Sequence, residues 1–207
     1  MKKVQDSYFL KARREGYAAR SIYKLEEIDK KHHLLKPGGH VLDLGAAPGS
    51  WLQYAASRVG PGGRVVGVDL QPVTVSLPDH AVVIEGDVFA LTAESLAAAT
   101  GGPEPGAPYD VVLSDMAPKT TGIPSADAAR SAELVLRTLE LSTALLASGR
   151  PLLAPGGALL AKIFQGARLN EVRRAFGEVF AKVSLEKPKA SRAESVEIFL
   201  LGLGKKS

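Results

Sequence analysis

The chain has 207 residues, of which 45% are hydrophobic and 23% charged, a composition that fits one globular domain and excludes an extensively disordered protein. It contains no cysteine, which excludes disulfides and thiolate metal sites. The N-terminus lacks the apolar region of a signal peptide, and no apolar run is long enough to cross a membrane, so we expect a cytoplasmic protein.

The net charge of +4 is distributed unevenly along the chain. Residues 1–40 carry ten Lys or Arg against five Asp or Glu, and residues 162–207 carry the same numbers. Residues 41–161 carry six basic against twelve acidic residues. Two basic ends around an acidic middle predict a surface for a polyanion, although solvated helix faces would give the same pattern.

The first part of the chain predicts a basic helical segment over residues 1–36. Its clearest helical pattern covers residues 18–35, where Ile22, Leu25 and Ile28 fall on one face and charged residues fill the other. The stretch "LLKPGG" ends this pattern.

Apolar runs and helical patterns alternate through the rest of the chain. Strands are expected at residues 40–45, 64–70, 81–87, 109–115, 157–164, 182–187 and 195–203. Helices are expected at residues 50–59, 91–100, 125–148 and 168–180. This alternation predicts a single α/β domain over residues 1–207, with a mostly parallel seven-stranded sheet and helices on both faces. Only "PKASRAE" separates the last two runs, so they should form an antiparallel hairpin.

The stretch "VLDLGAAPGSW", residues 41–51, predicts a strand, a glycine-bearing turn and the start of a helix. Gly45 and Gly49 allow the backbone to approach a ligand closely, and such loops lie at the ligand crevice of open α/β sheets. Asp69 ends the next strand, where a carboxylate can accept hydrogen bonds from the hydroxyls of a ribose. The loop therefore predicts a nucleoside cofactor.

The identity of that cofactor depends on the spacing of the loop. A dinucleotide site has the pattern G-x-G-x-x-G, whereas this loop reads G-A-A-P-G, which weakens a nicotinamide interpretation. An acidic-x-G-x-x-P-G loop looks instead like an S-adenosylmethionine site, in which Asp87 after the third strand would accept from the adenine amino group. Tight turns and helix caps remain the alternative for these glycines and carboxylates.

A lysine in the apolar stretch "GGALLAKIFQG" is the most unusual charge in the chain. Lys162 lies near the end of the fifth strand, and a buried ammonium requires a partner or a function. Asp115 ends the fourth strand, Glu197 lies in the last one, and Lys24 lies on the N-terminal helix. These four residues could form a cluster beside a methyl donor, although Lys24 could equally be an ordinary exposed lysine and Glu197 could face solvent.

With these motifs, the sequence resembles the FtsJ/RrmJ family of ribosomal RNA large-subunit 2′-O-ribose methyltransferases. The resemblance covers nearly the whole chain and is carried by "YFLKARREGYAARSIYKLEEID", "LDLGAAPGSW", "VLSDMAPKTTG", "AKIFQG" and "KPKASRAESVEIFLLG". It implies a Rossmann-like methyltransferase fold and a catalytic tetrad formed by Lys24, Asp115, Lys162 and Glu197. It implies cofactor contacts from Gly49, Trp51, Asp69, Asp87 and Asp115. Ser50 and Lys119 depart from the residues expected in many relatives.

Methyl transfer to a ribose requires a positioned hydroxyl that loses its proton during attack. We expect Lys162 to act as the base or to stabilise the developing alkoxide, with Lys24 orienting the ribose and its phosphate. Asp115 and Glu197 would then hold the two lysines.

The basic ends of the chain supply candidates for RNA binding. They lead into Lys24 and Glu197 respectively, so they could hold a phosphate backbone at the mouth of the site. The candidates are Lys11, Arg13, Arg14, Arg20, Lys187, Lys189 and Arg192. Few aromatic residues are available for base stacking, and the candidates expected to be exposed are Tyr8, Phe9, Tyr17 and Tyr23.

We therefore expect an S-adenosylmethionine-dependent 2′-O-methyltransferase of 23S ribosomal RNA, with a uridine target implied by the resemblance alone. The alternatives are a 2′-O-methyltransferase of tRNA or an mRNA cap, a noncatalytic RNA-binding protein with the same fold, and a nicotinamide-dependent oxidoreductase. No metal is expected, because His32 and His33 have no third ligand at usable spacing. A monomer is expected.

Overall fold

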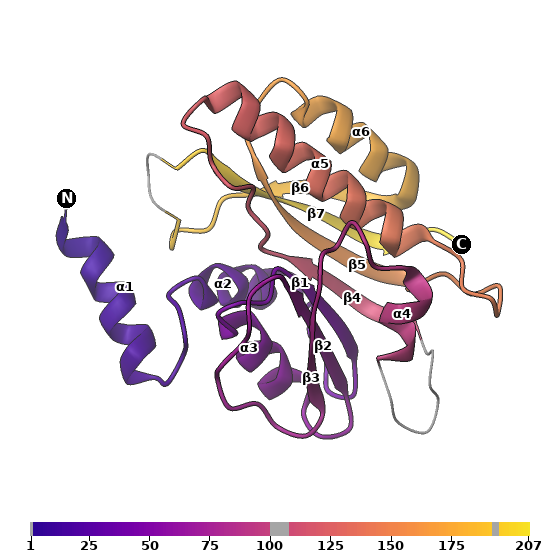
Figure 1. The fold of residues 1–207 in the computed structure, drawn as a ribbon, viewed down its shortest axis with the longest axis horizontal. Helices are drawn as coiled ribbons and strands as arrows, with labels where there is room; N and C mark the ends of the chain where they lie inside the picture. Colours follow the sequence, from indigo (N-terminus) through magenta and orange to yellow (C-terminus); the bar gives the residue numbers. More distant parts are fainter. Residues whose placement is uncertain (1, 100–107, 192–194) are drawn as a thin grey trace.

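A computed structural model describes residues 2–99, 108–191 and 195–207, and the side chains of the first helix from Ser7 onward. The sheet consists of β1 (His40–Leu44), β2 (Arg64–Asp69), β3 (Ala81–Glu85), β4 (Tyr109–Ser114), β5 (Leu153–Phe164), β6 (Phe180–Glu186) and β7 (Glu197–Lys205). The helices are α1 (Lys2–Arg14), α2 (Ile22–His32), α3 (Ser50–Val59), α4 (Ala93–Ala98), α5 (Pro124–Thr143) and α6 (Leu169–Val179) (Figure 1).

The seven strands form one mixed sheet in the order β3-β2-β1-β4-β5-β7-β6. The first five strands in the chain pair in parallel, and β7 pairs antiparallel with both β5 and β6. The predicted strand set and the antiparallel closing pair are confirmed. The strand order reverses between β1 and β4, and ligands of open α/β sheets bind beyond the carboxyl ends of strands at such a point.

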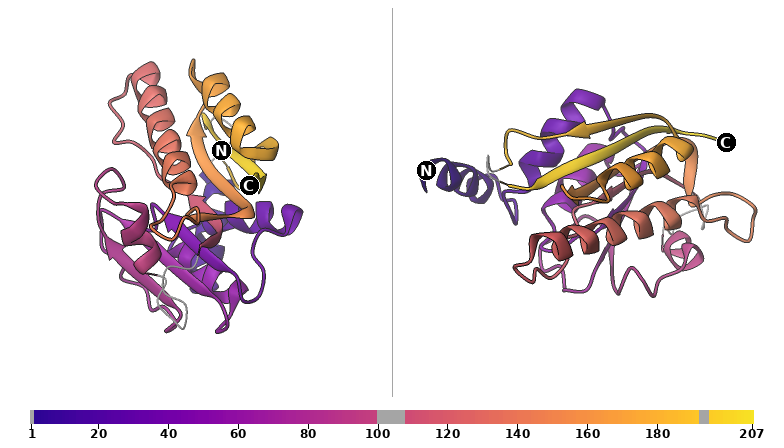
Figure 2. Two further views of the ribbon diagram at one scale, coloured as in Figure 1. Left: turned by 90° about the vertical axis from the view of Figure 1, so that its right-hand side faces the viewer. Right: turned by 90° about the horizontal axis from the view of Figure 1, so that it is seen from above.

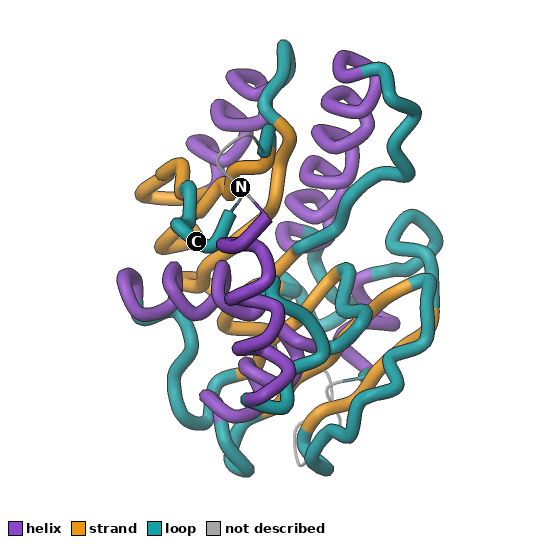
Figure 3. Tube along the Cα trace, turned by 90° about the vertical axis from the view of Figure 1, so that its left-hand side faces the viewer, coloured by secondary structure: helices purple, strands orange, loops and turns teal. Residues whose placement is uncertain are grey.

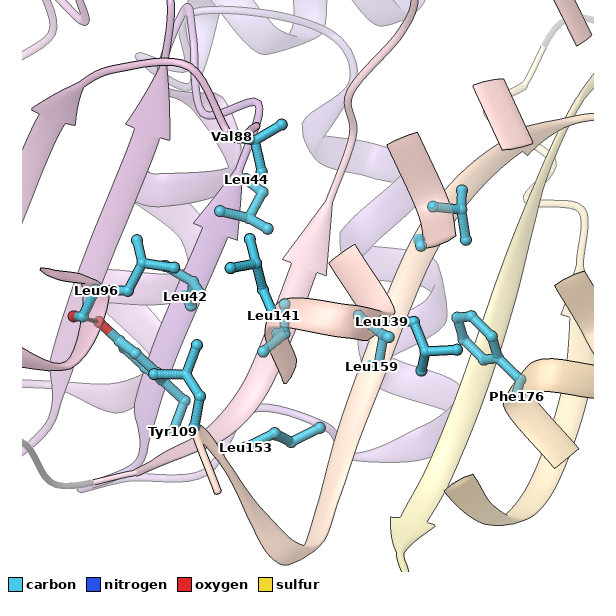
Figure 4. Close-up of a cluster of buried hydrophobic side chains, with 14 of the residues drawn as sticks. Leu42, Leu44, Val88, Leu96, Tyr109, Leu139, Leu141, Leu153, Leu159 and Phe176 are labelled. Carbon is cyan, nitrogen blue, oxygen red and sulfur yellow. Dashed lines mark hydrogen bonds between the residues drawn. The ribbon is translucent and has the colours of Figure 1, made fainter. Parts of the chain in front are cut away.

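Helices cover both faces of the sheet, as predicted (Figures 1 and 2). On one face, α4, α5 and α6 pack over alternate strand residues such as Leu42, Leu159 and Ile163 (Figure 4). On the other face, α2 and α3 pack over the intervening residues of the same strands, such as Val41 and Leu160. Burial on both faces explains why β1, β2 and β4 are almost continuously apolar.

Helix α1 extends from the body of the molecule toward one side (Figure 1 and the right-hand view of Figure 2), and in Figure 3 it lies toward the viewer, in front of the body. Ala12 is its buried contact with the core, and the Tyr8 ring lies 5.4 Å from that of Tyr23. The basic residues of its last turn, Lys11, Arg13 and Arg14, precede a glycine turn at Gly16.

Most predicted boundaries differ from the observed ones by a few residues, and two of these differences have a clear structural cause. The helix expected at residues 125–148 ends at Thr143, because the backbone of Ala144 is extended and Leu145 pairs with Pro151. The fifth strand begins at Leu153, several residues before the predicted start. Its register against β4 shifts between Tyr109 and Val111, so the early part of β5 forms an irregularity that apolar periodicity does not reveal.

The pairing of β6 with β7 depends on a glycine. A Cβ on Gly202 would lie 2.3 Å from the ring of Phe180, so the Gly202→Ala variant should lose about 1–3 kcal/mol of unfolding free energy through overpacking. Urea denaturation checks this result as a lower midpoint at an unchanged m-value.

Gly177 provides the control, because a Cβ there meets nothing within 4 Å and the residue is exposed in α6. Gly177→Ala should raise the stability by up to about 1 kcal/mol. Equal stabilities of the two variants would contradict the packing assigned to Gly202.

Candidate active site

A cavity of about 470 Å³ lies at the carboxyl ends of β1, β2, β3 and β4. Four of the six residues predicted to contact a cofactor line it, namely Gly45, Asp69, Asp87 and Asp115. Its volume falls in the range of small-molecule sites. Apolar walls are supplied by residues including Leu44, Val68, Phe89 and Met116.

The glycine loop adopts a conformation that only glycine reaches easily. Gly45 has φ +85° and Gly49 has φ +114°. A Cβ on Gly45 would come within 2.7 Å of Met116 in the segment after β4. A Cβ on Gly49 would collide with Val73 and Val75, so this glycine is required by the packing of the loop. Gly49 is absent from the cavity lining, and its predicted cofactor contact stays a prediction.

Backbone amides orient two carboxylates of the cavity. Asp69 accepts hydrogen bonds from the N–H groups of Ala47 and Gln71, at 2.9 and 2.8 Å. Asp87 accepts one from Phe89 at 2.9 Å. A carboxylate has about four acceptor positions, so each of these groups retains capacity for a ligand donor.

The side chain of Trp51 packs in the core and is absent from the cavity lining. Its ring lies 5.8 Å from that of Phe199, and its indole N–H donates to the Ser21 carbonyl at 2.9 Å. Trp51 lies in the first turn of α3, where backbone N–H groups have no acceptor within the helix. The predicted cofactor contact of Trp51 stays a prediction.

Asp43 is the residue of this region that the sequence interpretation did not single out. Its side chain is fully buried in β1, and neither carboxylate oxygen has a hydrogen-bond partner among the described residues. Burial, followed by the charges of Asp115 and Asp69, raises the pKa of Asp43 well above its ordinary value. The available signal was the acidic position of the pattern acidic-x-G-x-x-P-G, an unusual charge inside an apolar strand.

Lys162 is buried at the end of β5 and bound by Asp115. Its Nζ donates to the Asp115 carbonyl oxygen at 2.6 Å and forms an ion pair with Oδ1 of the same residue at 3.0 Å. The side chain of Lys162 is 6% exposed. The buried ammonium in the fifth strand therefore has its partner at the end of β4, where Asp115 also lines the cavity.

Lys24 on α2 meets Glu197 at the start of β7. The Lys24 Nζ donates to Oε2 of Glu197 at 2.9 Å, and both side chains are partly buried. Burial alone would raise the pKa of Glu197, but the charge and hydrogen bond of Lys24 and the charge of Lys162 together lower it. All four residues of the predicted cluster therefore lie together. Asp115 contacts Lys162, the charge of Lys162 acts on Glu197, and Glu197 contacts Lys24.

Only some of the predicted RNA-binding residues lie beside this cluster. Lys187 donates to the carbonyl oxygens of Ser195 and Glu197, directly beside the cluster. Arg20 donates to the Ala190 carbonyl at 2.8 Å, and Lys189 is exposed nearby in sequence. Lys11 is partly exposed, Arg13 and Arg14 are exposed on α1, and Arg192 lies outside the described residues.

One of the four aromatic residues predicted to be exposed for base stacking is buried instead. Tyr23 is buried, and its hydroxyl donates to Glu15 at 2.8 Å. Phe9 remains 54% exposed on α1.

The described residues contain neither a metal centre nor a membrane span. Within residues 2–99, 108–191 and 195–207, no group of three or more histidine or acidic side chains is placed to hold a metal ion. None of the helices in the described part of the chain is both long and apolar enough to cross a membrane.

The buried carboxyl of Asp43 predicts a pH-dependent stability. A raised pKa in the folded state stabilises the protein below the ordinary value of 3.8, and this contribution is lost as the pH rises above that value. The Asp43→Asn variant should lack this loss, so its melting temperature should rise relative to the wild type as the pH is raised above 3.8. Thermal unfolding without added ligand measures the difference.

Asp79 is exposed and serves as the control, since Asp79→Asn should keep the pH dependence of the wild type. Parallel curves for the wild type and Asp43→Asn would refute the raised pKa.

Comparisons with known proteins identify the family of the chain. FtsJ-like methyltransferases match residues 17–205 of the chain. Ribosomal RNA large subunit methyltransferase E of Sorangium cellulosum is 48% identical over 205 residues, which cover 99% of this chain and 90% of that protein. The protein of the same name from Syntrophobacter fumaroxidans is 49% identical over 201 residues, which cover 97% of this chain and 95% of that protein.

A solved structure supports the same relationship. The crystal structure of a protein described as a ribosomal RNA methyltransferase of Plasmodium falciparum superposes with a TM-score of 0.74 at 25% identity. The superposition covers 91% of this chain and 98% of that one. The chain thus belongs to the FtsJ-like methyltransferase family, whose enzymes use S-adenosylmethionine as the methyl donor.

Proposed function

We propose that this enzyme transfers a methyl group from S-adenosylmethionine to a ribose 2′-hydroxyl of large-subunit ribosomal RNA. Curated relatives named as ribosomal RNA large subunit methyltransferases support this substrate, because they are 48–49% identical over nearly the full chain. We further propose that the protein acts in the cytoplasm, where ribosomal RNA is available, as a monomer with one catalytic domain. The resemblance stated above implies a uridine as the target.

The observation that carries the proposal is the contact between the cavity and the Asp115–Lys162 pair. Asp115 lines the cavity and holds Lys162 through its carbonyl and its carboxylate. When bound, S-adenosylmethionine supplies an electrophilic methyl group. The carboxylates fit its polar parts: Asp69 would accept from the ribose hydroxyls, and Asp87 from the adenine amino group. Glycine at positions 45 and 49 and the backbone of Trp51 would complete the proposed cofactor contacts.

Lys162 is the group proposed to act on the hydroxyl of the substrate. A protonated lysine has three donor positions, and one of them donates to the Asp115 carbonyl oxygen at 2.6 Å. The Asp115 carboxylate forms an ion pair with the same ammonium at 3.0 Å without a hydrogen bond to Oδ1. A donor position on Nζ therefore remains for the 2′-hydroxyl. In that position an amine would accept the hydroxyl proton, whereas an ammonium would donate to the developing oxyanion while the proton passes to solvent.

Lys24 and Glu197 would position the ribose and its phosphate. Their ion pair at 2.9 Å holds the ammonium of Lys24 at the start of β7, where the charge of Lys162 also acts on Glu197. The carboxylate of Glu197 stays ionised because the neighbouring lysines lower its pKa, so it can accept a hydrogen bond from a ribose hydroxyl. The segment of residues 1–36 would thereby contribute both Lys24 and part of the RNA surface to one domain.

The enzymatic test is transfer of labelled methyl groups to ribosomal subunits, naked ribosomal RNA, tRNA and capped mRNA, followed by mapping of the modified nucleotide. We expect transfer to large-subunit RNA at a uridine 2′-oxygen. Transfer to tRNA or to the mRNA cap alone would show that this RNA, and not large-subunit ribosomal RNA, is the substrate. Cofactor binding without transfer to any RNA would indicate a noncatalytic RNA-binding protein.

The Lys162→Ala variant should abolish transfer, because it removes the nitrogen that faces the hydroxyl, while cofactor binding measured by calorimetry stays nearly unchanged. Lys182 is an exposed lysine on β6, and Lys182→Ala should retain wild-type activity. Activity of Lys162→Ala within a few-fold of the wild type would assign Lys162 a structural role.

The proposed RNA surface consists of Lys11, Arg13, Arg14, Arg20, Lys187, Lys189 and Arg192. Phosphate contacts release counterions, so the affinity for RNA should fall steeply with salt. A double variant, Arg13→Gln with Arg14→Gln, should flatten the plot of log affinity against log salt by about 0.7 for each single-stranded phosphate that the variant no longer neutralises. Filter binding at several salt concentrations measures the slope, and an unchanged slope would remove α1 from the surface.

A further inference from the structure

Two cavities of opposite character meet at the start of β7, and Ser195 and Glu197 line both of them. One has a volume of about 280 Å³ and is lined otherwise by Arg20, Ser21 and Lys24. The other has a volume of about 470 Å³ and lies between β5, β7 and the start of α5. Neither of them is the cofactor cavity, which has a different lining.

The smaller cavity is basic and is lined by groups that bind a phosphate. Arg20 and Lys24 bring two positive charges to it, against the one carboxylate of Glu197. The hydroxyls of Ser21 and Ser195 add hydrogen-bonding capacity. The hydrogen bond from Arg20 to the Ala190 carbonyl holds the positive charge of the guanidinium in place. This chemistry fits a phosphodiester.

The larger cavity is mainly apolar and matches a nucleobase. Phe164, Val196 and Pro124 form apolar walls, and Val196 is 52% exposed at the start of β7. The backbone N–H of Gln165 donates to the Val196 carbonyl at 2.9 Å, which joins the two strands that form one wall. The amide of Gln165 and the hydroxyl of Thr120 lie on the lining and offer donors and acceptors to the edge of a base.

The strand register places the reacting position between the two cavities. Glu197 pairs with Phe164 across β5 and β7, and Lys162 precedes Phe164 by two residues on the same face. Lys162 and Glu197 are therefore diagonal neighbours, about 7–8 Å apart at their Cα atoms. A ribose over Glu197 would present its hydroxyl to Lys162.

We propose that one nucleotide of the RNA lies across Glu197, with its phosphate in the basic cavity and its base in the apolar cavity. This inference rests on the proposed function and specifies how the substrate is oriented. It sets the base on the α5 side of the site and the phosphate on the α2 side. A base can enter the apolar cavity only after it leaves the stack, so the target nucleotide is bound unstacked.

The kinetic test fills the apolar cavity from two separate walls. Thr120→Trp places an indole in the cavity from the segment before α5, and Val196→Trp places one from the segment before β7. If both variants lose activity, the loss is explained by the filled cavity and not by damage to one segment. Each variant should lower kcat/KM for the RNA by about ten-fold or more, as expected for the loss of one stacked base. Cofactor affinity and thermal stability should remain at wild-type values.

Leu145 is the matched control, because it is 66% exposed beyond the opposite end of α5. Leu145→Trp should retain wild-type kcat/KM. If both cavity variants also retain it while the wild type methylates RNA, the inference fails and the proposed function stands. If the wild type methylates no RNA at all, the proposed function itself fails.

The salt dependence of RNA affinity tests the assigned orientation. Arg20→Gln keeps an amide donor for the Ala190 carbonyl but removes the charge, so it should flatten the salt slope by about 0.7. Val196→Trp should weaken binding without changing that slope, because a base carries no phosphate charge. A flatter salt slope for Val196→Trp together with an unchanged slope for Arg20→Gln would overturn the proposed orientation.

Discussion

The antiparallel register of β5 and β7 is the constraint on which the site depends. It pairs Lys162 with Phe199 and Phe164 with Glu197, so both charged side chains emerge from one face at the same end of the sheet. A shift of one residue would send Lys162 to the face covered by α5 and separate it from Glu197. Gly202 of β7 fits against Phe180 at the start of β6, and this close fit helps to hold β7 in its register.

Helix α2, which carries Lys24, reaches its position through polar contacts to several parts of the fold. Asp29 is buried and accepts hydrogen bonds from Tyr54 and Leu35. Glu186 on β6 binds both Lys31 and His32 at the other edge of the sheet. The indole N–H of Trp51 and the hydroxyl of Ser50 both bond Ser21, one turn before Lys24. The residues that follow the cofactor loop therefore also position a lysine of the cluster.

The alternation of apolar runs and helical patterns was sufficient to predict the sheet, because each strand is buried on both faces and each helix has one apolar side. The carboxyl ends of β4 and β5 likewise followed from the pattern, which placed Asp115 and Lys162 together. The role of the Trp51 side chain could not be predicted, because a tryptophan after a glycine loop fits a ligand contact and core packing equally well. The irregular start of β5 and the isolation of the Asp43 carboxyl depend on neighbours distant in sequence, which a linear pattern does not contain.

The projection of α1 from the body has a consequence for how the enzyme meets a large polyanion. A helix of 13 residues is about 20 Å long, roughly twice the distance over which physiological salt screens a charge. Arg13 and Arg14 are exposed in its last turn, beside the turn that leads toward Arg20 and Lys24. The helix therefore enlarges the region from which a phosphate backbone is attracted, and the graded approach toward Lys24 would turn a diffusional encounter into an oriented one.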